Sequence, residues 1–156
     1  MFEKRIIINN SNEIIQLGEK IGKLAIPNMV ITMTGDLGAG KTTMTKGIAL
    51  GLGITEIVNS PTFTIMKIYH GSLTLYHLDV YRITDPYSDF ELEEYFENNG
   101  VCVIEWAQQV QPILPDDLFE IEIFDLGDNK REVILKSNSE KYINIIQEVI
   151  QWEHLS

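Results

Sequence analysis

Hydrophobic and polar positions alternate between strand-like and helix-like patterns along the first part of the chain. Residues 4–8 are typical of a short strand. Asn10 and Glu13 have the spacing of a capping box, which predicts the start of a helix. Apolar residues then recur at helical spacing as far as Leu24. Residues 29–34 form a short apolar run rich in β-branched side chains, which predicts a buried strand.

The rest of the chain continues this alternation, and glycines mark several of its ends. Gly51 and Gly53 are placed to end one helix. Gly71 and Ser72 lie between two strand-like runs and suit the tight type II′ turn of a β-hairpin. In order, the pattern predicts a helix (41–52), two strands (63–70 and 73–78), an acidic helix (85–98), a buried strand (101–104), a hairpin of two strands (118–124 and 131–136) and a final helix (140–152).

Strands and helices that alternate along a chain are typical of an α/β fold. The length of 156 residues suits one domain, and the pattern contains no internal repeat or low-complexity linker. We therefore predict a single domain over residues 1–156. Its central sheet should be mixed and largely parallel, with helices on its faces and hairpins added at its edges.

Charge narrows the classes of function. The chain carries 12 Lys and Arg against 23 Asp and Glu, which gives a formal net charge of −11. Direct binding to nucleic acid or to an anionic membrane surface is therefore not favoured, because both rely on clustered cations. A phosphate ligand stays open, since backbone N–H groups bind phosphate without basic side chains.

Cysteine content and apolar run length bear on the cellular compartment. Cys102 is the only cysteine, so no disulfide can form within the chain. The apolar runs are far shorter than the roughly 20 residues of a membrane span. We expect a cytoplasmic protein.

The most specific motif is the glycine-rich loop between the strand at 29–34 and the helix at 41–52. It matches G-x-x-x-x-G-K-[ST] in the right structural context, which favours a P-loop NTPase-like domain over a plain glycine turn. Its backbone N–H groups can surround a phosphate at a helix N-terminus. Lys41 would reach the β- and γ-phosphates, and the Thr42 hydroxyl would bind Mg²⁺. The predicted nucleotide-binding residues are Gly35, Asp36, Leu37, Gly38, Ala39, Gly40, Lys41, Thr42 and Thr43.

Two carboxylates follow apolar strands at the edge where an α/β sheet binds its ligands. Asp79 comes directly after the run 73–78, and Glu105 comes directly after the run 101–104. A P-loop ATPase needs a carboxylate near its metal and a group that orients the attacking water. We place Asp79 near Mg²⁺ and Glu105 as a metal ligand or general base. The alternative is that each carboxylate only caps the next turn or helix.

Other polar and aromatic residues have two interpretations each. Thr62 belongs either to a loop that senses the nucleotide or to an ordinary proline turn. Trp106 follows Glu105 and either stacks at the site or packs in the core. The acidic residues of 85–97 form either a solvated helix face or a docking patch for a basic partner. His70 and His77 do not indicate a metal site.

Together these motifs resemble the TsaE (also YjeE) family of small bacterial P-loop ATPases. The resemblance rests on G-D-L-G-A-G-K-T-T at 35–43, S-P-T-F-T at 60–64, H-L-D-V-Y-R at 77–82 and V-I-E-W at 103–106. It implies a role in forming N6-threonylcarbamoyladenosine at position 37 of tRNAs that read codons starting with A. It also implies that the protein acts on a complex of two companions, TsaD and TsaB. The transfer would not be its own reaction, and tRNA would be met only through that complex.

The resemblance also implies roles for individual residues. ATP or ADP and Mg²⁺ would be the ligands, and Glu105 would be needed for hydrolysis. The residues carried over are Lys41 and Thr42 for phosphate and Mg²⁺, Thr62 in a switch-like loop, Asp79 at the nucleotide, Glu105 at Mg²⁺, Trp106 at the site, and Ser11 and Arg131 near the adenine. Ala107 departs from the family, in which a proline is common at this position, so the local loop shape is not predicted by the resemblance.

Other classes of P-loop protein stay open. A small-molecule kinase usually needs several cations around the transferred phosphoryl group, and Arg82 and Arg131 are the only arginines beyond the P-loop. A GTPase needs an N-K-x-D element, and the run 129–132 has Glu in the place of that Asp. A nucleotide-gated binding switch with negligible hydrolysis is compatible with every motif.

Overall fold

The computed structural model describes residues 1–36, 38–61, 65–83, 85 and 92–155. The strands are β1 (Phe2–Ile8), β2 (Met29–Gly35), β3 (Met66–Tyr69), β4 (Leu75–Asp79), β5 (Val101–Glu105), β6 (Phe119–Gly127) and β7 (Lys130–Ser137). The helices are α1 (Ser11–Leu24), α2 (Lys41–Gly51), α3 (Glu93–Phe96), the 3₁₀ helix η1 (Ala107–Ile113) and α4 (Glu140–Leu155).

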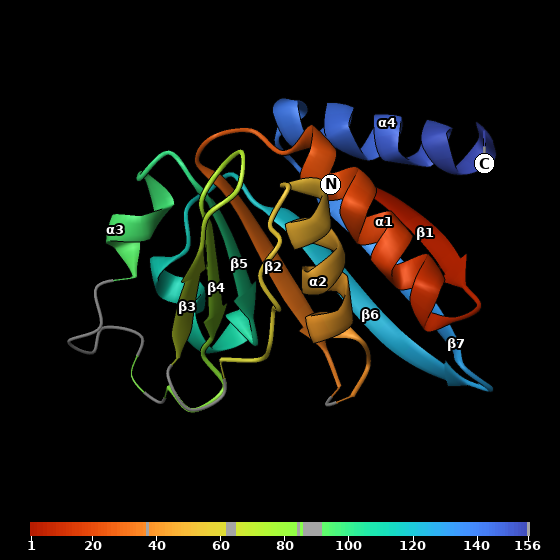
Figure 1. Ribbon diagram of the computed structural model, residues 1–156, viewed down its shortest axis with the longest axis horizontal. Helices are drawn as coiled ribbons and strands as arrows, with labels where there is room; N and C mark the ends of the chain where they lie inside the picture. Colours follow the sequence, from red (N-terminus) through yellow and green to blue (C-terminus); the bar gives the residue numbers. More distant parts are fainter. Residues whose placement is uncertain (37, 62–64, 84, 86–91, 156) are drawn as a thin grey trace.

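In the described part of the chain, seven strands form one sheet in the order β1-β7-β6-β2-β5-β4-β3 (Figure 1). β2 lies at the centre and is parallel to β5 and β6, and β4 is parallel to β5. Antiparallel pairing adds β7, β1 and β3 at the edges. This confirms the prediction of an α/β fold with a largely parallel centre and hairpin additions.

The parallel strands bring the predicted site residues to one edge of the sheet. Glu105 of β5 pairs with Met33 on one side and with Asp79 on the other. The loop that follows Gly35 leaves β2 at this same edge. Carboxyl ends of parallel strands are the usual binding edge of such sheets, so the fold itself gathers the P-loop and both carboxylates.

Alternating side chains give the sheet two buried faces. On β5, Val103 packs in the same cluster as Ile48 of α2, while Ile104 packs with Phe96 of α3 and Val110 of η1. This period of two is what a strand buried on both sides requires. Figure 1 shows α1 and α2 in front of the sheet and α3 beyond β3. The face shared by Val103 and Glu105 is therefore the face that α2 covers.

Helices α1 and α2 approach each other more closely than side chains would allow. A Cβ built on Gly47 of α2 would lie 2.3 Å from the carbonyl oxygen of Ile15. A Cβ built on Gly22 of α1 would lie 2.2 Å from the carbonyl oxygen of Ile48. Both distances are far below ordinary contact, so glycine is required for this backbone-to-backbone packing. The packing fixes α2, and with it the residues at its N-terminus.

Two local predictions are confirmed. The Asn10 side chain accepts the Glu13 backbone N–H at 3.0 Å, which caps α1 as predicted. The Glu13 carboxylate in turn accepts the backbone N–H of Asn9, one residue before the N-cap, at 2.7 Å. β6 and β7 form the late hairpin, whose turn residues Asp128 and Asn129 have positive φ. None of the helices in the described ranges is long and apolar enough to cross a membrane.

The tight turn at Gly71-Ser72 is a wrong prediction. Tyr69 and Leu75 are the last residues that β3 and β4 pair, so five residues connect the strands. The loop is longer because it docks on the end of α2, where the Ser72 backbone N–H donates to the carbonyl oxygen of Leu52 at 2.7 Å. A Cβ on Gly71 would lie 2.3 Å from that same oxygen. Glycine at this position therefore serves close approach, not turn geometry.

The acidic helix predicted over 85–98 is wrong at both of its ends. Residues 86–91 lie outside the described residues, but Asp85 is not helical and the helix that is described spans only Glu93–Phe96. Three acidic side chains, Glu93, Glu94 and Glu97, are exposed around this single turn. Glu93 and Glu97 are four residues apart, and like charges at this spacing oppose extension of the helix.

Candidate active site

The P-loop joins β2 to α2 at the carboxyl edge of the sheet. Gly40 is the N-cap of α2 and has φ 116°, ψ 16°, a left-handed conformation that favours glycine. It turns the loop into the helix, so that the first backbone N–H groups of α2 face the loop rather than a preceding helical turn. Lys41 and Thr42 are the first two helical residues. This is the arrangement that binds phosphate at a helix N-terminus.

Lys41 is held inside the site rather than extended into solvent. Its side chain is 5% exposed, and its Nζ donates to the carbonyl oxygens of Gly35 at 2.5 Å and Asp36 at 3.1 Å. Burial lowers the pKa of Lys41, and the negative charges of Glu105, Asp79 and Asp36 oppose that shift. Two neutral carbonyls thus pre-position the ammonium group among carboxylates, next to the loop that would hold phosphate.

Thr42 and Glu105 converge from two different elements. Thr42 Oγ1 donates to Glu105 Oε1 at 3.4 Å, and Glu105 is 3% exposed. Asp79 ends the neighbouring strand, and its Oδ1 accepts the Tyr81 backbone N–H at 3.0 Å. Lys41, Thr42, Asp79 and Glu105 line one cavity of about 190 Å³ together with Ser60, Tyr81, Arg82 and Trp106.

The donor atoms in this cavity fit Mg²⁺. The Thr42 hydroxyl and a Glu105 carboxylate oxygen lie 3.4 Å apart among its lining residues, and oxygen ligands are the ones that Mg²⁺ prefers. Among the described residues there is no cluster of three or more His, Cys, Asp or Glu side chains that could hold a metal. A nucleotide-bound Mg²⁺ does not need such a cluster, because phosphates and waters supply most of its ligands.

Trp106 lies at the cavity and not in the core alone. Its backbone is left-handed, with φ 64° and ψ 38°, and its N–H donates to the carbonyl oxygen of Met33 at 3.1 Å. The ring centroid lies 4.0 Å from Lys41 Nζ and 4.7 Å from the centroid of the Tyr81 ring. The indole therefore covers the ammonium group of the P-loop lysine, which is a cation–π contact.

Sequence reasoning missed His77. It lies two residues before Asp79 on β4, is fully buried, and its Nε2 is hydrogen-bonded to Glu105 Oε2. The available signal was the strand period: His77 and Asp79 share one face of β4, and that face is the one on which Glu105 lies. The interpretation that His77 holds no metal is compatible with this contact.

Comparison with known proteins agrees with these motifs. The family model described as "Threonylcarbamoyl adenosine biosynthesis protein TsaE" matches residues 8–133. The chain belongs to the TsaE family. The tRNA threonylcarbamoyladenosine biosynthesis protein TsaE of Bacillus subtilis is 45% identical over 148 residues, which cover 94% of each chain. The protein of the same name from Treponema pallidum is 41% identical over 131 residues, 83% of this chain and 97% of that protein.

A solved structure extends the likeness to three dimensions. The crystal structure of Bacillus subtilis YdiB superposes on this TsaE-family chain with a TM-score of 0.87 at 39% identity, covering 97% of each chain. This includes β6, β7 and α4, which follow the part of the sequence where the motifs lie. The fold is therefore that of a solved relative over nearly its whole length.

Not every residue expected at the site of this TsaE-family chain is gathered there. Arg131 of β7 reaches the P-loop, where its Nε donates to the carbonyl oxygen of Ala39 at 2.9 Å, and it pairs with Asp125 at 3.3 Å. Thr43 follows Thr42 in the first turn of α2. Leu37 and Thr62 lie outside the described residues.

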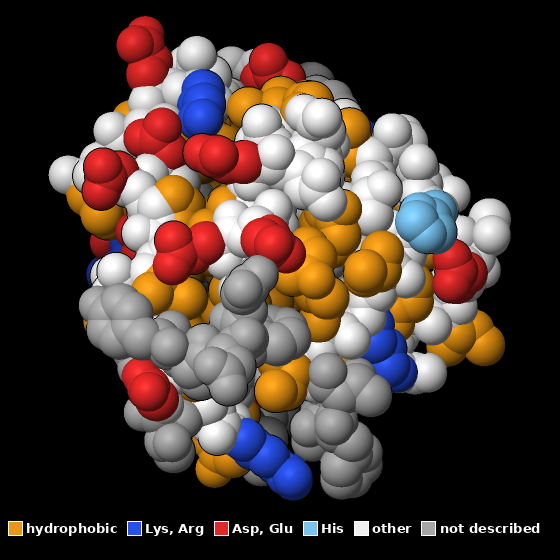
Figure 2. Space-filling model, turned by 90° about the vertical axis from the view of Figure 1, so that its left-hand side faces the viewer, with side chains coloured by type: hydrophobic (Ala, Val, Ile, Leu, Met, Phe, Trp, Pro, Cys, Tyr) orange, Lys and Arg blue, Asp and Glu red, His pale blue; other side chains and the backbone are white. Residues whose placement is uncertain are grey.

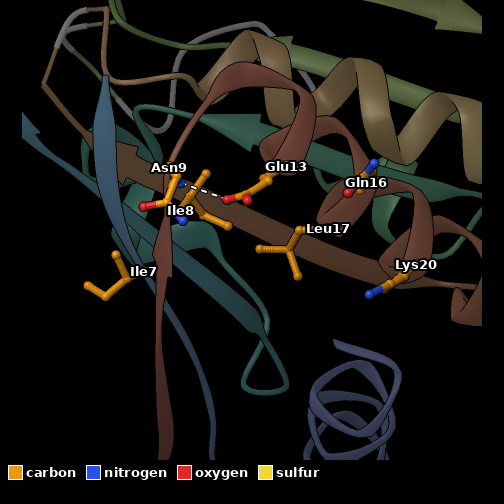
Figure 3. Close-up of a pocket in the computed structure, with 7 residues that line it drawn as sticks. All are labelled: Ile7, Ile8, Asn9, Glu13, Gln16, Leu17 and Lys20. Carbon is orange, nitrogen blue, oxygen red and sulfur yellow. Dashed lines mark hydrogen bonds between the residues drawn. The ribbon is translucent and has the colours of Figure 1, made fainter. Parts of the chain in front are cut away.

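Ser11 is exposed at the start of α1 and does not line the cavity that contains Lys41. The junction of β1 and α1 has a pocket of its own, about 180 Å³, which Figure 3 shows between Ile7, Asn9, Glu13 and Lys20. The P-loop is nevertheless near α1, because a Cβ on Gly40 would lie 3.1 Å from the Ile14 side chain.

Proposed function

We propose that this protein is a Mg²⁺-dependent ATPase that supports formation of threonylcarbamoyladenosine in tRNA. The observation that carries the ATPase proposal is the cavity in which Lys41, Thr42 and Glu105 meet at the N-terminus of α2. The tRNA role rests on family membership and on the printed names of relatives at 45% and 41% identity.

Each residue has a defined task in this proposal. The backbone N–H groups at the start of α2 and the Lys41 ammonium bind the phosphates and stabilise charge that develops on the transferred group. Mg²⁺ held by Thr42, Asp79 and Glu105 would neutralise phosphate charge. Glu105 orients the attacking water or accepts its proton. Trp106 shields Lys41 from bulk water, which strengthens its interaction with phosphate.

The proposed partners are the TsaD and TsaB companion proteins, with tRNA met only through their complex. A net charge of −11 supports this view, because a protein of this charge binds poorly to RNA by itself. Figure 2 looks onto the side that carries α3, where acidic side chains lie around an apolar area. Exposed Glu93, Glu94 and Glu97 belong to this side, which we propose as the docking patch.

Charge reversal tests the docking patch. We expect the double variant Glu93→Lys, Glu94→Lys to weaken binding to the companion complex, measured by calorimetry, without changing ADP affinity. Both side chains are exposed, so the fold should tolerate the change. Undiminished affinity for the companions would remove the patch from the proposal.

Reconstituted tRNA modification tests the function as a whole. The companions and tRNA should form the modified nucleoside over many turnovers only when this chain and ATP are added. Lys41→Ala should lose phosphate binding, and Glu105→Gln should bind ATP yet stop supporting turnover. Equal modification with and without the chain would refute the tRNA role, and full support by Glu105→Gln would refute hydrolysis as its basis.

A further inference from the structure

The two oxygens of the Glu105 carboxylate have different hydrogen-bond partners, His77 and Thr42. Oε2 is hydrogen-bonded to His77 Nε2, and Oε1 accepts the Thr42 hydroxyl at 3.4 Å. His77 is fully buried and Glu105 is 3% exposed, so bulk water does not compete for either group. In the register of β4 and β5, Asp79 lies opposite Glu105, and His77 is one pleat earlier on the same face.

We propose that His77 is a positioning residue for Glu105. Its Nε2–H holds one carboxylate oxygen and thereby aims the other at Thr42 and the cavity. This inference rests on the proposed ATPase function, since it assigns a supporting group to the carboxylate of that site. Without the donor, the buried carboxylate loses a hydrogen bond to one oxygen and regains side-chain rotations that turn Oε1 away from Thr42. Partners that orient a ligand-bearing side chain in this way govern metal affinity and activity.

The surroundings of the ring decide which nitrogen carries the hydrogen. An ionised carboxylate only accepts, so Nε2 must be the donor. His77 Nδ1 is buried and has no hydrogen-bond partner among the described residues. An N–H at Nδ1 would be a buried donor without an acceptor, which costs free energy. A ring nitrogen without a hydrogen costs less free energy when it is buried without a partner. A hydrogen on Nε2 and none on Nδ1 satisfies both ends of the ring, and the hydrogen on Nε2 is what positioning requires.

A merely structural histidine would behave differently from a positioning one. If His77 only filled space on β4, an apolar side chain would replace it without effect on the chemistry. The geometry instead requires a donor at the Nε2 position. The side-chain amide of Gln reaches about as far as Nε2, while that of Asn reaches only as far as Nδ1 and Leu offers no donor. The three variants therefore separate hydrogen bonding from volume.

Nitrogen NMR of the imidazole rings tests the tautomer without any turnover. The His77 resonance is assigned by its loss in His77→Gln, and exposed His70 serves as the internal reference. We expect His77 to be the neutral Nε2–H tautomer and its ring shifts to change in Glu105→Gln. A Nδ1–H tautomer would overturn the proposal, because Nε2 could then not donate to Glu105. This readout stands even if the protein proves to have no ATPase activity.

Steady-state kinetics of ATP hydrolysis, measured with the companions present, tests whether His77 affects the function of Glu105. His77→Leu and His77→Asn should lower kcat by roughly 10- to 100-fold and raise the Mg²⁺ concentration for half-maximal rate, with little change in the KM for ATP. His77→Gln should restore most of the lost kcat. His70→Leu, an exposed control on the β3–β4 loop, should match the unaltered chain. Equal kcat in the Leu and Gln variants, with melting temperatures showing both folded, would overturn the proposal. Absence of hydrolysis in the unaltered chain would refute the ATPase proposal instead.

Discussion

Replacing Gly47 with alanine tests the packing that holds α2, and therefore the P-loop, in place. In an unpacked helix this substitution stabilises by roughly 1 kcal/mol. Here the new Cβ would lie 2.3 Å from the carbonyl oxygen of Ile15, whereas ordinary contact begins at 3.4 Å. Helices α1 and α2 must separate by about 1 Å, and overpacking of this kind costs roughly 1–3 kcal/mol. The atoms nearest to the new Cβ are backbone atoms of Ile15 and Gly18, which cannot rotate away as a side chain can, so the upper half of that range applies. We expect a net loss of about 1–2 kcal/mol after the helix-propensity gain.

Thermal and urea unfolding measure this loss. For a chain of this size, each kcal/mol lowers Tm by roughly 2–4 °C, so Gly47→Ala should melt about 2–8 °C lower. Lys46→Ala is the matched control, because Lys46 is the preceding residue of α2 and is exposed. Its free energy of unfolding should stay within about 0.5 kcal/mol of the unaltered chain. An unchanged or higher Tm for Gly47→Ala would refute the argument from close helix packing.

Two further predictions concern single side chains. In a Trp152→Phe background, the fluorescence emission of Trp106 should change when ADP is added. Lys41 Nζ lies 4.0 Å from the centroid of the Trp106 ring and must turn toward phosphate when the nucleotide binds. A constant emission while calorimetry detects binding would contradict this. Burial raises the pKa of Cys102 to about 12, so at pH 8 a thiol-specific disulfide reagent should modify it only after unfolding. Rapid modification of the folded chain would show that this thiol is not shielded.

The position of the P-loop at the carboxyl edge of the sheet was predictable because it depends on local sequence. The P-loop needs a buried strand before it and a helix after it, and the hydrophobic period and the glycine spacing predict both. Asp79 and Glu105 were predicted from their position after apolar runs, and the parallel register then places them opposite each other.

What the sequence could not predict depends on contacts between distant segments. The loop after β3 is set by the end of α2, since Ser72 bonds to Leu52. The strand period places His77 on the same face of β4 as Asp79, but its hydrogen bond to Glu105 depends on the register between β4 and β5, which the pattern of β4 alone does not contain. Arg131 reaches Ala39 because β7 lies beside β6 at the P-loop edge, and its residue type alone does not indicate that contact.

Steady-state ATP hydrolysis, with and without the TsaB and TsaD companions, tests the central claim most directly. We predict slow hydrolysis by the chain alone, strong stimulation by the companions, and loss of that stimulation in Glu105→Gln while ATP still binds. Stimulation is expected because a partner can complete a P-loop site that has few cations of its own. Hydrolysis that the companions do not stimulate, with ADP tightly retained, would contradict the account and favour a nucleotide-gated binding switch.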